Sequence, residues 1–176
     1  IRSAITGINN ITVACLNTQH YKEGKKWNDR TDSLLYVYRL RPDADSEVCD
    51  HYRARIRLFN ALTAYEFGHR AEADASFAAF QKTDYAATEQ GKLDANDYLM
   101  KAHRFEEAAK NFRMLDHWVD VRGMKMNLDN ISMYLIPKYR ANIGASRKDS
   151  AIYVANQIVN AYDSALVWSK RDDTAE

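Results

Sequence analysis

Histidines are the side chains with which this chain could most readily hold a metal ion or transfer a proton. No two of them are four residues apart, the spacing that places a pair on one helix face, and neither His-Glu-x-x-His nor Cys-x-x-Cys occurs. The sequence therefore predicts no metal ion and no other cofactor. The residues concerned are His20, His51, His69, His103 and His117.

An acidic run at residues 43–47 resembles the opening of a calcium-binding loop. Its sixth position is Val48 where a calcium loop needs glycine for its sharp turn, and the distal glutamate is missing. We interpret the run as a polar linker in which Asp45 or Ser46 caps the following helix.

The sequence supports nucleophilic catalysis no better than it supports a metal site. The sequence contains no Gly-x-Ser-x-Gly and no glycine-rich phosphate loop, and no cysteine has a plausible partner histidine. Glu106 and Glu107 fall in the first turn of an expected helix, where the helix dipole favours acidic residues. We expect this chain to have no catalytic residue and no enzyme activity. Cys15 and Cys49 are compatible with buried free thiols or with a disulfide in an oxidising compartment.

Composition favours long helices that could position a binding surface. Apolar residues make up 46% of the 176 residues, and the six glycines and two prolines are too few for a chain with many tight turns. β-branched residues do not alternate with polar ones, so strands are not expected. We predict an all-α fold.

The charge pattern argues against nucleic acid as a partner. The net charge is +1 and basic residues form no stripe, since on a helix Arg55 points away from Arg53 and Arg57. No apolar run approaches the ~20 residues that cross a bilayer, so this piece itself is expected to be soluble. The chain begins at Ile1, which we interpret as a processed or excised piece of a longer protein.

A repeat is the strongest internal signal. Ala73 and Ala108 are 35 positions apart, as are Phe77 and Phe112. This spacing is close to the 34-residue tetratricopeptide (TPR) period, in which a small residue lets paired helices approach and an aromatic residue four positions later fills the gap between them. The sequence predicts a single domain over 1–176, a right-handed TPR-like superhelix of about four antiparallel hairpins at approximately 4–40, 48–83, 86–117 and 124–170.

Eight helices are expected in these hairpins. Gly24 (in a turn at 21–25), Gly68 and Gly144 are placed in the turns within pairs, where a left-handed residue is often needed. Pro137 should kink or break the seventh helix. The predicted helices are 4–21, 26–40, 48–67, 71–83, 86–101, 105–117, 124–143 and 149–170.

The last helix carries an apolar stripe at steps of three and four, which we interpret as its buried face. The stripe comprises Ile152, Ala155, Val159, Tyr162 and Leu166.

A concave surface is the expected binding site. In a curved hairpin stack the first helix of each pair lines the inner side. The TPR register places six residues there, and the apolar ones could equally pack between helices. They are Gln19, Leu62, Tyr65, Asp97, Met100 and Arg140.

Several segments resemble the TPR-containing sensory regions of bacterial membrane-bound sensor histidine kinases, including hybrid two-component regulators. The similarity runs through most of the chain and is strongest from about residue 61 onward. The segments are Asp94-Ala95-Asn96-Asp97-Tyr98-Leu99-Met100, Arg104-Phe105-Glu106-Glu107-Ala108-Ala109, Leu128-Asp129-Asn130-Ile131, Ile136-Pro137-Lys138-Tyr139-Arg140-Ala141-Asn142 and Ala161-Tyr162-Asp163-Ser164-Ala165.

The resemblance implies a periplasmic sensing domain placed before a membrane helix and a cytoplasmic kinase core. Its signal would be a peptide, a protein or a small molecule, and a homodimer is compatible with this arrangement. The resemblance supplies no ligand residues, so the expected groove residues Gln19, Tyr65, Asp97 and Arg140 rest on the TPR register alone. The phospho-accepting histidine segment and ATP lid of the kinases are absent from this sequence, so no catalytic residue can be transferred from them. The alternative is a free-standing TPR adaptor for protein–protein interaction, cytoplasmic or in the cell envelope.

Overall fold

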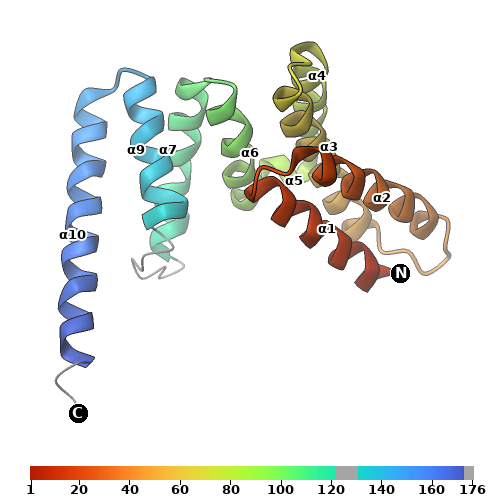
Figure 1. The fold of residues 1–176 in the computed structure, drawn as a ribbon, viewed down its shortest axis with the longest axis horizontal. Helices are drawn as coiled ribbons and strands as arrows, with labels where there is room; N and C mark the ends of the chain where they lie inside the picture. Colours follow the sequence, from red (N-terminus) through yellow and green to blue (C-terminus); the bar gives the residue numbers. More distant parts are fainter. Residues whose placement is uncertain (122–130, 173–176) are drawn as a thin grey trace. The chain divides into compact units, whose positions relative to one another are not determined.

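The computed structural model describes residues 1–121 and 131–172, and within them every regular element is a helix, which confirms the all-α prediction. Figure 1 shows the elements along the chain. They are α1 (Arg2–Asn17), α2 (Tyr21–Arg39), α3 (Ser46–Glu66), α4 (Arg70–Gln81), α5 (Asp84–Ala87), α6 (Glu89–Lys101), α7 (Phe105–Val121), the π-helix η1 (Ile131–Leu135), α9 (Ile136–Gly144) and α10 (Lys148–Asp172).

The chain forms two compact units, Ile1–Tyr98 and Leu99–Glu176. In the first, α1, α2, α3 and α4 pack in chain order, each against the next, and α5 lies against α3 and α4. In the second, α9 packs between α7 and α10, and η1 contacts both α9 and α10. Helices that neighbour each other in sequence are therefore neighbours in space within each unit.

Four helix-to-helix connections have the same backbone geometry. The pivotal residues have φ angles of 62°, 81°, 57° and 58°. Each donates its N–H to the carbonyl three residues earlier, and the next residue donates to the carbonyl five residues before itself. This pair of bonds is the Schellman motif, which satisfies the last carbonyls of a helix. The pivotal residues are Gln19, Gly68, His103 and Ser146.

The sequence after each pivot also repeats. The next helix begins two residues later in all four cases. Five residues after each pivot comes a small, buried side chain, at Gly24, Ala73, Ala108 and Ala151. The small residue lies one turn into the second helix, where a larger side chain would push the helices apart. The predicted equivalence of Ala73 and Ala108 is therefore a structural equivalence as well.

The turn prediction is right at Gly68 and wrong at the other two glycines. Gly24 lies inside α2 and is buried, and a Cβ there would be 3.3 Å from Cys15 Cβ, so its role is close packing of α1 on α2. Gly144 is the last residue of α9, and Ser146 takes the left-handed conformation. Gln19 and Ser146 show that a polar residue can hold this position when both Schellman bonds form.

Two predicted helices differ in detail. The expected helix 86–101 is divided into α5 and α6 at Thr88, which has an extended backbone with ψ of 160°. The expected helix 124–143 includes residues 124–130, which lie outside the described part. From residue 131 it starts as the π-helix η1, which continues directly into α9, and Pro137 stands in the first turn of α9. The helix changes type near Pro137 without a break, since Leu135 keeps helical angles with φ of −69° and ψ of −42°.

The stripe predicted to be buried on the last helix is exposed at Ile152, Val159 and Tyr162 and half-buried at Ala155. Ile152 is 61% exposed, Val159 56% and Tyr162 42%, whereas Ala151 and Val154 are buried. Leu166 lies outside the residues whose side chains the structure describes. α10 is rotated by about one residue from the predicted orientation because its small side chains, led by Ala151, face the rest of the unit.

The linker before α3 and the two cysteines are also defined. Asp45 caps α3 by accepting hydrogen bonds from the backbone N–H groups of Glu47 and Val48, as expected.

Cys15 and Cys49 are both free thiols, and Cys49 is buried. In the part of the chain that the structure describes, no helix has the length and apolar character needed to span a bilayer.

Candidate functional site

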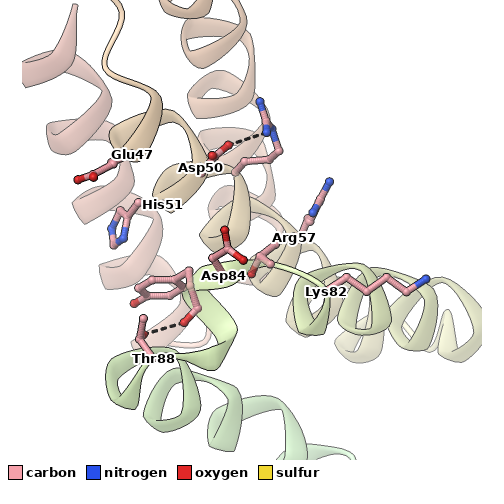
Figure 2. A pocket seen from close by; sticks show the side chains of 10 residues that line it. Glu47, Asp50, His51, Arg57, Lys82, Asp84 and Thr88 are labelled. Carbon is pink, nitrogen blue, oxygen red and sulfur yellow. Dashed lines mark hydrogen bonds and ion pairs between the residues drawn. The ribbon is translucent and has the colours of Figure 1, made fainter.

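The candidate site is a groove between α3 and α5 in the first unit, with a volume of about 650 Å³ (Figure 2). We call it the α3–α5 groove. Its lining combines three basic and three acidic side chains with two threonines, a histidine and a tyrosine. They are Glu47, Asp50, His51, Arg53, Arg57, Lys82, Thr83, Asp84, Tyr85 and Thr88.

α3 supplies one wall because of its helical spacing. Positions 50, 53 and 57 recur at steps of three and four and therefore share a face. Between them Ala54, Ile56 and Leu58 are buried, which fixes the rotation of α3 in the core. Arg53 and Arg57 line the groove and Arg55 does not, in agreement with the opposite directions expected from the sequence.

Arg55 has a supporting role in the other wall. Its Nη1 lies 3.5 Å from Oδ2 of Asp94 in α6, and the same oxygen accepts a 2.7 Å hydrogen bond from the hydroxyl of Tyr85. Gln90 donates to the other oxygen of Asp94 over 2.9 Å. The half-buried carboxylate of Asp94 thereby ties α5 to α3 and α6 and orients the Tyr85 ring. Burial and this carboxylate raise the pKa of Tyr85, so the phenol stays protonated and remains a donor.

Gly91 fixes the position of the short helix α5. A Cβ at this buried residue would lie 2.7 Å from the carbonyl carbon of Tyr85 and 2.9 Å from Cα of Ala86. Since real side chains do not approach backbone atoms so closely, the contact between α5 and α6 requires glycine here. Thr88, between the two helices, donates from its hydroxyl to the Tyr85 carbonyl over 2.7 Å and accepts from the Gly91 N–H over 3.0 Å.

An aromatic pair lies in the groove, one helical turn along α3 from Glu47. The rings of His51 and Tyr85 meet edge to face with centroids 4.7 Å apart. Burial and, after it, the positive charge of Arg55 lower the pKa of His51, while Asp94 opposes the shift. The imidazole is therefore neutral at pH 7 and offers an uncharged, partly apolar surface.

Charges of opposite sign stand toward the two ends of the groove. Figure 2 shows Glu47 beside His51 at one end and Lys82 at the other. Arg57 belongs to the basic end, because its Nη1 donates to the carbonyl of Ala79 in α4, 3.2 Å away, three residues before Lys82.

Pairing differs among these charges. Arg53 and Asp50 form an ion pair over 2.8 Å and neutralise each other. Within the described residues, no ion pair involves Glu47, Arg57, Lys82 or Asp84. These four residues line an open groove and have no ion-pair partner there, so a ligand could neutralise their charge.

The residues predicted from the TPR register are not gathered by these contacts. Gln19, Tyr65 and Asp97 belong to the first unit and Arg140 to the second. Gln19 is the pivot of the α1–α2 connection, and Asp97 and Arg140 are exposed on α6 and α9. Among the described residues, no hydrogen bond or ion pair joins any two of the four.

Tyr65 and the two apolar candidates take part in packing. The guanidinium of Arg70 lies 3.2 Å from the centroid of the Tyr65 ring, which also meets Tyr98 edge to face. Leu62 is buried and Met100 half-buried, as expected if they pack between helices.

The groove residues could be found only in part from sequence. Three arginines at every second position of α3 were the available signal, and the alternation correctly separates Arg55 from the other two. Nothing in the local sequence places Lys82 or Asp84 opposite them, because that depends on the break at Thr88 and on Gly91.

In the described ranges, no three His, Cys, Asp or Glu side chains are arranged to hold a metal ion. What the arrangement can do is bind a ligand through charge and through the face of an aromatic pair.

Comparisons with known proteins add no constraint on this assignment. No protein-family model matches the chain, no curated protein matches it, and no solved structure matches it.

Proposed function

We propose that this chain is a non-catalytic binding module that takes up its ligand in the α3–α5 groove and serves as the periplasmic sensory part of a bacterial two-component protein. The observation that carries the binding role is the set of unpaired charges, Glu47, Asp84, Arg57 and Lys82, facing an open groove of about 650 Å³. Charged groups without partners favour a charged ligand, because binding would supply the missing counter-charges.

The sensory role rests on the resemblance to TPR-containing regions of sensor histidine kinases and on the hairpin architecture. Four connections with one geometry join helices that pack in chain order within each unit, so a shift of one helix would be passed to the next. The ligand of such a sensor must distinguish two packings of these helices. A free-standing adaptor would use the same groove for a segment of a partner protein.

Retention of peptides from a defined mixture tests the binding role. The chain is dialysed to equilibrium against a tryptic digest of serum albumin, and the retained peptides are identified by mass spectrometry. We expect a retained subset for the natural chain that the Arg57→Ala/Lys82→Ala variant loses. The matched control is Lys110→Ala/Arg113→Ala, which removes two exposed charges from α7. Equal retention by the natural chain and the groove variant would refute the groove as the binding site.

The coding sequence of the parent protein separates the sensor from the adaptor. A sensor requires an apolar segment of about 20 residues and a kinase core beyond this region. A reading frame that carries neither would contradict the sensory role and leave the adaptor.

A further inference from the structure

We infer that the ligand of the α3–α5 groove is a short extended peptide of about five residues, basic at one end, acidic at the other, with an apolar or aromatic side chain between them. This inference rests on the proposed function and specifies the chemical class of its ligand. It follows from the order of the charges along the groove.

The distance between the charged ends sets the size of the ligand. Glu47 and Arg57 are ten residues apart on α3, which corresponds to roughly 15 Å along the helix axis. A single amino acid or compact metabolite cannot reach both ends. An extended peptide rises about 3.3 Å per residue, so about five residues cover the distance.

The sign of the charges sets the polarity of the ligand. Glu47 at one end attracts a basic side chain or an amino terminus, and Arg57 and Lys82 at the other attract an acidic side chain or a carboxyl terminus. The guanidinium of Arg57 donates one N–H to the carbonyl of Ala79, and this hydrogen bond holds the guanidinium in place. Its other N–H groups remain able to donate to a carboxylate. Asp84 adds negative charge between the ends, which disfavours a uniformly acidic ligand such as a nucleic acid.

The aromatic pair sets the central side chain, because position 51 falls between Glu47 and Arg57 along α3. His51 is neutral at pH 7 and forms an edge-to-face pair with Tyr85, and Asp50 and Arg53 cancel each other. A flat apolar side chain can cover this aromatic pair without leaving a buried charge unpaired. An acidic residue at that position would lack a counter-charge and would be repelled by Asp84.

Capped synthetic peptides test the inference by isothermal titration calorimetry. The probe is Lys-Ala-Phe-Ala-Glu, compared with Lys-Phe-Glu, which keeps the same functional side chains but spans roughly 7 Å instead of roughly 13 Å between its terminal Cα atoms. We expect the longer peptide to bind at least about fivefold more tightly, which corresponds to one exposed charge pair gained. Equal affinity for the two lengths would overturn the assigned span.

Charge-reversal variants test the polarity. The Glu47→Lys variant should prefer Glu-Ala-Phe-Ala-Glu over the mixed peptide, and the Arg57→Glu/Lys82→Glu variant should prefer Lys-Ala-Phe-Ala-Lys, each by about fivefold. Circular dichroism checks that each variant keeps its helix content, and Lys110→Glu/Arg113→Glu serves as the matched control.

The outcomes separate this inference from the proposed function. If the variants weaken all peptides equally, or if none of these peptides binds, the dipolar peptide is refuted. The digest experiment then still decides whether the groove binds a ligand of another class. If neither the digest nor the synthetic peptides respond to the groove variants, both proposals fail.

Discussion

The Cα of Gly91 packs directly against the backbone of Tyr85, so closely that a Cβ on Gly91 would lie 2.7 Å from the Tyr85 carbonyl carbon. This contact holds α5 against α6 and keeps the Tyr85 ring in the wall of the α3–α5 groove. Close packing of backbone on backbone cannot be relieved by rotating a side chain.

Gly91→Ala should therefore lower the free energy of unfolding by about 2 kcal/mol, because the backbone of α5 has to move. The matched control is Gly7→Ala, since Gly7 lies inside α1 and a Cβ added there would have no atom within 4 Å. That substitution should stabilise the chain by about 0.5–1 kcal/mol through higher helix propensity. Urea unfolding followed by circular dichroism measures both, and a Gly91→Ala variant as stable as Gly7→Ala would contradict the contact.

The four Schellman connections predict that glycine is favoured at each pivot, so removing it at one position and introducing it at another should change stability in opposite directions. Gly68 and His103 both have a left-handed backbone, with φ of 81° and 57°. Gly68→Ala should cost about 1 kcal/mol, and His103→Gly should stabilise by about 1 kcal/mol, because a Cβ is strained in this conformation. Thermal unfolding measures the two shifts. Destabilisation by His103→Gly would argue against the shared geometry.

A buried cation in the second unit makes a further prediction. The ammonium of Lys138, whose side chain is 6% exposed, forms an ion pair with Asp116, which also accepts a 2.8 Å hydrogen bond from the hydroxyl of Tyr134. Asp116→Asn should cost about 1–2 kcal/mol, because it removes the counter-charge of the buried ammonium while Asp116 itself, at 41% exposure, is partly screened by water.

The control for this substitution is Asp43→Asn. Asp43 pairs with Arg41 at an exposed site, and loss of an exposed pair should leave stability unchanged within error. Chemical denaturation compares the two variants, and Asp116→Asn/Lys138→Met should recover part of the loss. Equal effects at the exposed and buried pairs would contradict the assignment.

The lowered pKa of His51 makes stability depend on pH. The unfolded chain takes up a proton near pH 6.5, whereas burial and Arg55 disfavour the charged form in the folded chain. The stabilising contribution is present above pH about 6.5 and is lost as the pH falls below this value. Urea unfolding between pH 7.5 and 5 measures the slope, which His51→Gln should reduce. The exposed His117 provides the control substitution, and a His51 resonance that titrates above pH 6.5 in NMR would contradict the sign.

The sequence could predict the helices and their approximate ends because these depend on local periodicity. The equivalence of Ala73 and Ala108 follows from the same periodicity. The turn at Gly68 could be predicted from its glycine, but the pivots Gln19 and Ser146 could not, since they adopt the left-handed conformation without glycine when two backbone hydrogen bonds compensate. The face of α10 was misjudged because two apolar stripes lie side by side, and the packing of Ala151 and Val154 decides between them.

The sequence predicted less of the candidate site than of the fold. The TPR register alone selects Gln19, Tyr65, Asp97 and Arg140. Whether four residues from distant helices meet depends on tertiary structure, which the register does not predict. The groove residues of α3 could be separated from Arg55 by helical phase. Their partners on α4 and α5 depend on how α5 is positioned by Gly91, a contact with no local signature.

Locating the ligand by NMR tests binding in the α3–α5 groove most directly. The ¹H–¹⁵N spectrum of the chain is titrated with capped Lys-Ala-Phe-Ala-Glu, and shifts are mapped onto the assigned backbone. Groove binding predicts saturable shifts concentrated in residues 47–57 and 82–88. Shifts concentrated elsewhere, for example around Arg140 in α9, or shifts that fail to saturate, would contradict binding of this peptide in the groove.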